Sequence, residues 1–113
     1  MKCLSFNCRG LASASKKLAL RRLIEVEPID IILLQETLGM VDHISQSLHS
    51  MIQRWTFVAL DVARRSGGLA IGYNPRTIRV DASWGGSGFL GLDIFSVDLG
   101  MIFRIVNVYG PCQ

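Results

Sequence analysis

Three polar residues, Asn7, Glu36 and Tyr109, each stand at the carboxyl end of a predicted strand. Glu36 is the clearest case, because the apolar segment Ile29–Leu34 ends abruptly in Gln35 and this carboxylate. Ligand and metal sites in layered α/β proteins tend to lie just outside the carboxyl ends of strands. A carboxylate at this position is therefore a candidate for catalytic or metal-binding chemistry.

Each of these residues also has a simpler interpretation when it is taken alone. An Asn after a strand is usually a turn residue, a Glu there is usually solvated, and a Tyr before Gly-Pro usually packs. The hypothesis of a site therefore depends on whether the fold brings Asn7, Glu36 and Tyr109 together.

The first part of the chain predicts a strand, helix, strand unit. Lys2–Asn7 has the pattern of a short strand, and a helix follows it to about Val26, where Pro28 prevents its continuation. The apolar segment from Ile29 then forms the second strand. Such units normally pair their strands in parallel through a right-handed crossover, so we expect Asn7 and Glu36 to be neighbours.

The remaining sequence predicts one more helix and a series of antiparallel strands. Helical spacing of apolar residues indicates a helix over about Val41–Gln53. Period-two patterns and glycine-rich turns then predict strands in the segments starting at Trp55, Leu69, Ile78, Leu90 and Met101. The fold class is therefore α/β (α+β), with one mixed, largely antiparallel sheet of about seven strands and two helices on one face.

Two details of the strand pattern can be compared with a structure. Four residues alternate so that they should share one face of their strand, namely Ile78, Val80, Ala82 and Trp84. In the following strand the apolar positions change parity after Ile94, which predicts a β-bulge or register slip near that residue.

Composition limits the class of protein. The 113 residues are half hydrophobic, which favours one packed domain, yet no apolar run is long enough to span a membrane. No signal peptide is recognisable, and three cysteines without CxxC spacing are expected to be reduced, so we expect an intracellular protein that is not secreted. The net charge of +3 allows a polyanionic partner. The densest basic cluster is interpreted as a solvated helix face; it consists of Lys16, Lys17, Arg21 and Arg22.

Four segments, in this order, resemble motifs of the endonuclease/exonuclease/phosphatase family: Ser5–Leu11, Leu33–Thr37, Ser66–Ile71 and Val106–Pro111. Within that family the sequences of these motifs are most similar to those of the endonuclease domain of plant non-LTR (LINE-type) retrotransposons. The resemblance extends over essentially the whole chain. It implies half of a four-layer, DNase I-like sandwich, and an intracellular, nuclear location if the chain derives from a retroelement.

The resemblance also implies roles for the strand-end residues. The family hydrolyses phosphoesters with a divalent metal, usually Mg²⁺ and sometimes Mn²⁺, and its endonucleases act on DNA. Glu36 would bind the metal, Asn7 would lie beside the metal as a second metal-site residue, and Tyr109 would contact the substrate phosphate. Gly67-Gly68 would open a core strand in a structural role, because no Walker-type Lys-Ser or Lys-Thr follows.

Other parts of the family's machinery do not occur in this sequence. The family uses an Asp-x-Asn motif and a later Asp-His pair to activate water, and neither is found here in the expected position. We therefore expect residues 1–113 to form the N-terminal half of the domain, inactive alone, with a bare sheet face that the second half or another chain must cover. Whether the chain is an enzyme stays open. The alternatives are a phosphodiesterase for abasic-site DNA or phosphoinositides, and a non-catalytic interaction module or structural remnant.

Overall fold

The computed structural model describes residues 1–10, 14–38, 41–60 and 68–108, with only the backbone for 41–43. The described chain contains two helices and seven strands, as the sequence predicted. In chain order they are β1 (Cys3–Asn7), α1 (Ala14–Val26), β2 (Ile31–Gln35), α2 (Val41–Met51), β3 (Thr56–Leu60), β4 (Leu69–Tyr73), β5 (Ile78–Gly86), β6 (Phe89–Ser96) and β7 (Met101–Val108).

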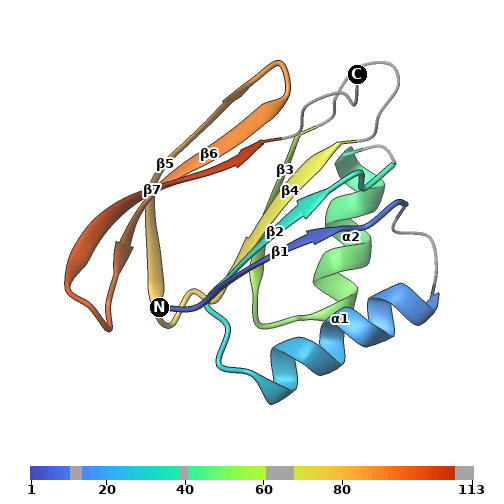
Figure 1. The fold of residues 1–113 in the computed structure, drawn as a ribbon, viewed down its shortest axis with the longest axis horizontal. Helices are drawn as coiled ribbons and strands as arrows, with labels where there is room; N and C mark the ends of the chain where they lie inside the picture. The colour runs from blue at the N-terminus through green and yellow to red at the C-terminus, as the bar shows by residue number, and fades with distance from the viewer. Residues whose placement is uncertain (11–13, 39–40, 61–67, 109–113) are drawn as a thin grey trace.

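The strands form two sheets, which corrects the prediction of a single seven-stranded sheet. One sheet has the order β1-β2-β4-β3 and the other the order β5-β6-β7 (Figure 1). β1 pairs with β2 in parallel, as expected, and the other pairs are antiparallel. The second sheet exists because β2 and β4 are buried on both faces, and helices can cover only one of them.

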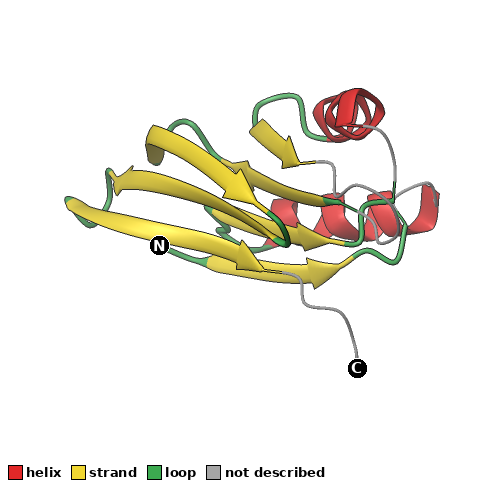
Figure 2. Cartoon of the chain, turned by 90° about the horizontal axis from the view of Figure 1, so that it is seen from above, coloured by secondary structure: helices red, strands yellow, loops and turns green. Residues whose placement is uncertain are grey.

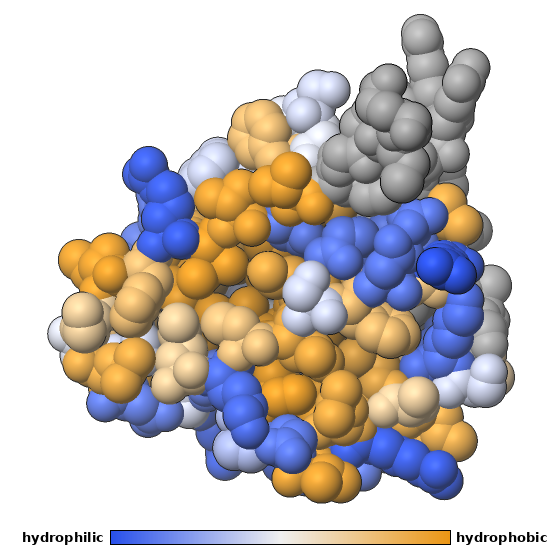
Figure 3. All heavy atoms as spheres, viewed as in Figure 1, coloured by the Kyte–Doolittle hydropathy of each residue, from blue (hydrophilic) through white to orange (hydrophobic). Residues whose placement is uncertain are grey.

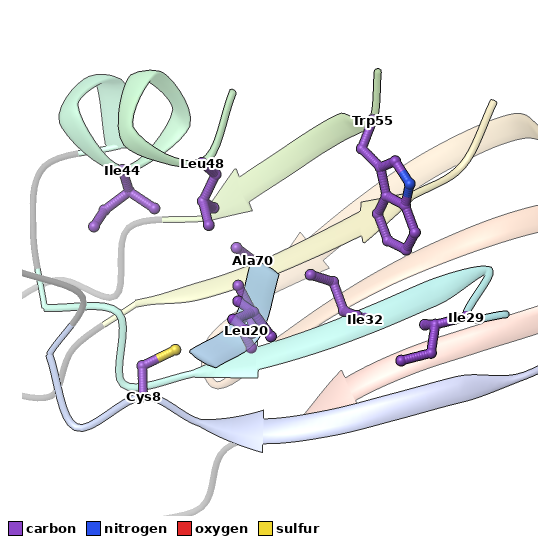
Figure 4. Close-up of a cluster of buried hydrophobic side chains, with 9 residues drawn as sticks. Cys8, Leu20, Ile29, Ile32, Ile44, Leu48, Trp55 and Ala70 are labelled. Atoms are coloured by element: carbon purple, nitrogen blue, oxygen red, sulfur yellow. The ribbon is translucent and has the colours of Figure 1, made fainter. Parts of the chain in front are cut away.

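Apolar side chains on the two faces of β2 and β4 build two separate cores. Both helices lie on one side of the four-stranded sheet (Figure 2). On that side Leu20 of α1 and Leu48 of α2 pack with Ile32 and Ala70 (Figure 4). On the other side Ile31 and the inward side chains of β4 meet those of β6, including Leu90, Leu92 and Ile94. The architecture is therefore three layers: helices, four-stranded sheet and three-stranded sheet.

A β-bulge in β5 changes which residues face this inner core. The register shifts between Val80 and Ala82, so Asp81 is an extra residue opposite the Ile94 region of β6. The sequence predicted a bulge or register slip near Ile94 of β6. The structure has the irregularity opposite Ile94, but the extra residue belongs to β5. Because one extra residue reverses the parity of the strand, Trp84 lies on the opposite face from Ile78 and Val80, against the prediction.

The outer face of the three-stranded sheet carries aromatic and basic side chains. Trp84 packs over Gly91, where a Cβ would lie 2.5 Å from the indole ring. The guanidinium of Arg104 lies 5.5 Å from the centre of that ring, and it forms an ion pair with Asp93.

Neither helix of the described chain has the length and apolarity needed to cross a bilayer.

The face of the four-stranded sheet that we expected to be bare is therefore largely covered by β5–β7. Exposed apolar residues lie elsewhere, notably on β7, where Ile102 is 74% exposed and Val108 is 62% exposed. β1 also keeps Cys3, Ser5 and Asn7 exposed on the side away from the helices. Exposed apolar side chains thus lie on β7 and the turn before it, and also on α1, where Val26 is 79% exposed.

The side chain of Asn107 joins the two sheets. Its Nδ2 donates hydrogen bonds to the carbonyl oxygens of Leu34 in β2 and Ala70 in β4, at 2.9 and 3.0 Å. Its Oδ1 accepts a hydrogen bond from Nε2 of Gln35 at 2.8 Å. Asn107 is 1% exposed, so these contacts satisfy polar groups that water cannot reach. They also fix where the end of β7 lies over β2 and β4.

We predict that Asn107→Ala lowers the free energy of unfolding by about 2–4 kcal/mol, because it leaves two buried carbonyl groups without this donor. Chemical denaturation measures the change. The control is Ile102→Thr in the same strand, where an exposed side chain should change stability by no more than about 0.5 kcal/mol. Equal losses in the two variants would contradict a joining role for Asn107.

Candidate functional site

The parallel pairing of β1 and β2 brings the predicted residues together. Asn7 is the register partner of Gln35, so Glu36 follows directly beside it. The Nδ2 of Asn7 donates a hydrogen bond to Oε2 of Glu36. The Oδ1 of Asn7 accepts the backbone N–H of Arg9 at 3.1 Å. Two contacts therefore fix the orientation of the amide: a donor must face the carboxylate and an acceptor must face the Arg9 N–H.

The chain segments after the two strands are tied together by their backbones. The N–H of Cys8 donates to the carbonyl of Gln35, and the N–H of Gly10 donates to the carbonyl of Glu36, both at 2.8 Å. The described non-glycine residues with positive φ are Arg9, Glu36 and Leu38, at 48°, 52° and 49°. Left-handed backbone is costly for such residues, and it persists where surrounding contacts hold it. All three lie in these two segments.

Gly68, the residue before β4, contacts Thr37, the residue after Glu36. Its carbonyl accepts the N–H of Thr37 at 3.3 Å, and its φ is 69°. A Cβ at this position would lie 2.5 Å from Oγ1 of the buried Thr37. Glycine is therefore required here by both conformation and space, which agrees with the structural role expected for it. Gly67 lies outside the described residues.

Tyr109 lies outside the described residues, so its contact with a substrate phosphate stays a prediction. The strand that precedes it is described to Val108. That strand reaches the site end of β2, because Asn107 contacts the carbonyl of Leu34 and the side chain of Gln35.

The donors at this site suit a hydrated divalent cation. Glu36 is partly exposed, and Mg²⁺ usually takes one or two protein carboxylates while keeping several waters. The described residues contain no group of three His, Cys, Asp or Glu side chains able to hold a metal. In this arrangement the Asn7 amide orients Glu36, and a direct contact of Asn7 with a metal stays a prediction. The site accordingly fits one protein carboxylate with water ligands.

Lys16 is a site neighbour that sequence reasoning missed. Its Nζ donates to the carbonyl oxygens of Cys8 and Arg9, at 2.7 and 3.0 Å. The interpretation of the basic cluster as a solvated helix face is therefore wrong for Lys16. The sequence feature that could have indicated these contacts is the position of Lys16 in the first turn of the helix, shortly after the Arg9-Gly10 break.

Cys8 lies beneath the site and is fully buried. Burial raises the pKa of its thiol to about 11, Lys16 opposes this rise, and Glu36 adds to it. The thiol is therefore protonated at neutral pH and acts as an apolar core group. The two described cysteines, Cys3 and Cys8, are both free thiols.

A hollow lies at the opposite end of the four-stranded sheet from Glu36. It has a volume of about 920 Å³ and is lined by the C-terminal parts of both helices and by the turn after β4. Arg21, Arg54 and Arg76 contribute to its wall, but so do Glu25 and Glu27. Helix C-termini carry partial negative charge, which disfavours phosphate groups. The strand ends at Glu36 are the better candidate site.

Several solved structures share this fold. No protein-family model matches the chain, and no curated protein matches it significantly. The mannosyl-6-phosphatase of Bacteroides thetaiotaomicron is 13% identical, with a TM-score of 0.68, over 92% of this chain and 49% of its own. D. rerio TDP2 complexed with a single strand DNA product is 15% identical, with a TM-score of 0.70, over 91% and 43%. The AP endonuclease of Leishmania major is 23% identical, with a TM-score of 0.67, over 93% and 38%.

The matching set also includes a B. thetaiotaomicron structure described as an endonuclease/exonuclease/phosphatase family protein, with a TM-score of 0.68. The chain has the endonuclease/exonuclease/phosphatase fold. This agrees with the resemblance of its motifs and with half of a DNase I-like sandwich. The chain spans about half the length, or less, of the solved structures named here.

We predict that stability falls as pH rises from about 8.5 toward 11, because Cys8 ionises in the unfolded chain before it ionises in the folded one. The folded state then holds a proton that the unfolded state has lost, so each step in pH favours unfolding. Denaturant titrations across this range should show a loss on the order of 2 kcal/mol that Cys8→Ala removes. Cys3→Ala should keep most of the loss, and an unchanged slope in Cys8→Ala would contradict the assignment.

Proposed function

We propose that this chain forms part of a divalent-metal-dependent phosphodiester hydrolase that acts on DNA. The observation that carries the proposal is the contact between Asn7 and Glu36 at the joined ends of β1 and β2. A carboxylate oriented by an amide at a strand end is suited to hold a hydrated cation. The solved structures with the same fold include nucleases and phosphatases, which supports phosphoester chemistry.

Each residue has a defined task in this proposal. Glu36 would hold Mg²⁺, or Mn²⁺ in its place, and the bound ion would polarise the phosphoryl group. Asn7 keeps the Glu36 carboxylate in one orientation through its amide hydrogen bond. Tyr109 would donate a hydrogen bond from its phenol to a phosphate oxygen and so fix the substrate.

DNA is the substrate that the sequence favours. The net charge of +3 suits a polyanionic partner, and the motif sequences resemble those of the endonuclease of LINE-type retrotransposons. One structure with this fold is a TDP2 complexed with a single strand DNA product, and another is an AP endonuclease. A nuclear retroelement nuclease that nicks DNA is therefore the specific proposal, and abasic-site DNA or a phosphoinositide is the alternative substrate of the same chemistry.

The proposed hydrolase needs more polypeptide than residues 1–113. The three-stranded sheet contacts β4 through β6 and β7, contacts β2 through β7, and leaves the non-helical side of β1 exposed. β7 is an edge strand with exposed apolar side chains, and apolar residues gather on this side of the molecule (Figure 3). An extended segment paired to the open edge of β7 would cover the apolar side chains of β7 and the exposed side of β1. We propose that a second half of the domain, or another chain, supplies this segment and the missing base.

A non-catalytic role is the second candidate. The described residues offer Glu36 as a single carboxylate at the site, with no three-residue acid, His or Cys group around it. Such a site can bind a cation weakly without activating water. The chain would then act as an interaction module or structural remnant that keeps the fold.

We predict that residues 1–113 bind Mn²⁺ or Mg²⁺ at one site, and that Glu36→Gln weakens this binding at least about tenfold. Isothermal titration calorimetry measures the affinity. The control is Glu25→Gln near the C-terminal end of α1, which removes an exposed carboxylate that pairs with Arg21 and lines the hollow at the opposite end of the sheet from the site. Equal weakening in both variants would show that binding is a general effect of surface charge.

We predict that residues 1–113 alone do not nick plasmid DNA in Mg²⁺, because general-base catalysis contributes about 10²–10⁴-fold in rate and its residues are not in this sequence. Conversion of supercoiled to relaxed plasmid measures nicking. Activity that is present in the wild-type chain and lost in Glu36→Gln would overturn this prediction while supporting the role of Glu36.

A further inference from the structure

Lys16 occupies a position that helix electrostatics disfavours. It lies in the first turn of α1, where a positive charge meets the positive end of the helix dipole and no described residue of that turn is acidic. Its side chain nevertheless reaches away from the helix to two carbonyl oxygens, those of Cys8 and Arg9. Hydrogen bonds from an ammonium group are stronger than those between neutral groups, so the two contacts offset the unfavourable position.

The two carbonyls belong to the strained turn that follows β1. Arg9 has a φ of 48° and Gly10 a φ of 93°, so two consecutive residues are left-handed. In that conformation the N–H of Arg9 points back to Oδ1 of Asn7. Holding the carbonyls on either side of the Arg9 N–H restricts this peptide group. The ammonium of Lys16 therefore stabilises the backbone that orients the Asn7 amide.

A chain of contacts consequently runs from α1 to the candidate site. Lys16 holds the Arg9 backbone, the Arg9 N–H holds Oδ1 of Asn7, and Nδ2 of Asn7 donates to Glu36. If the amide turned over, its oxygen would face a carboxylate oxygen, and both are acceptors.

We propose that Lys16 is a positioning residue that acts through the Arg9 backbone to keep the Asn7 amide directed at Glu36, and so preserves the site for a divalent cation. The cation part of this inference rests on the proposed function. The orientation of the amide does not, because it is defined by hydrogen bonds to Glu36 and to the Arg9 backbone within the chain itself. The two parts can therefore be tested separately.

The experiment compares Lys16→Met, which keeps the aliphatic stem, with Lys16→Arg, which keeps the charge. Lys17→Met is the matched control, because it removes the same charge from the next residue of α1. For each variant NMR records the side-chain amide signals of Asn7 without metal, calorimetry measures Mn²⁺ affinity, and thermal melting measures stability. The NMR signals report the amide even if the wild-type chain binds no metal.

Lys16→Met should shift the Asn7 amide signals toward the values of a free side chain and weaken Mn²⁺ binding about tenfold. Lys16→Arg should restore both, and Lys17→Met should leave both unchanged. If Lys16→Met lowers the melting temperature but leaves the Asn7 signals unchanged, Lys16 is merely structural and the proposal is wrong.

Two further outcomes are also decisive. Lys16→Gln serves as a second neutral variant. If neither Lys16→Met nor Lys16→Gln folds, while Lys17→Met does, Lys16 is required for folding and the proposal is wrong. If the wild-type chain binds no Mn²⁺ but its Asn7 signals respond to Lys16→Met, the positioning of the amide is supported and only the proposed metal function fails.

Discussion

The hydrogen bonds of Asn107 are the constraint on which the layered structure depends. A strand at the edge of the second sheet is held there over two strands of the first by one side chain that contacts Leu34, Gln35 and Ala70. Apolar packing between the sheets is not directional, so it alone would tolerate sliding. Buried hydrogen bonds do not, because a shift leaves polar groups without partners. The end of β7 is thereby fixed beside the strand that delivers Glu36.

The candidate site is held by contacts from several elements rather than by one motif. Left-handed residues at Arg9 and Glu36 are accommodated because backbone hydrogen bonds join the two segments after β1 and β2. On one side, the absence of a side chain at Gly68 leaves room for the Thr37 side chain. On the other, Lys16 donates hydrogen bonds to the carbonyls of the Cys8–Gly10 turn. Strain concentrated beside a carboxylate is typical of sites whose geometry serves binding, where local stability is lost in exchange for orientation.

The two sheets differ in size, and this difference links the fold to the proposed function. Four strands face three, so β1 has no strand above it, and β7 presents an open edge with apolar side chains beside it. The solved structures that share the fold are about twice as long as this chain. A covering segment would complete the sandwich next to Glu36, where the proposed chemistry needs further polar groups.

The sequence by itself determined the elements and the pairing at the site. Apolar periodicity and Pro28 defined the first helix and the strands beside it, and the crossover rule placed Asn7 next to Glu36, because these features depend on local sequence. The tertiary structure alone decided the division into two sheets, the reversed face of Trp84 and the role of Lys16. Each of these depends on contacts between residues distant in sequence, or on one bulged residue, Asp81, whose effect on parity no periodic pattern records.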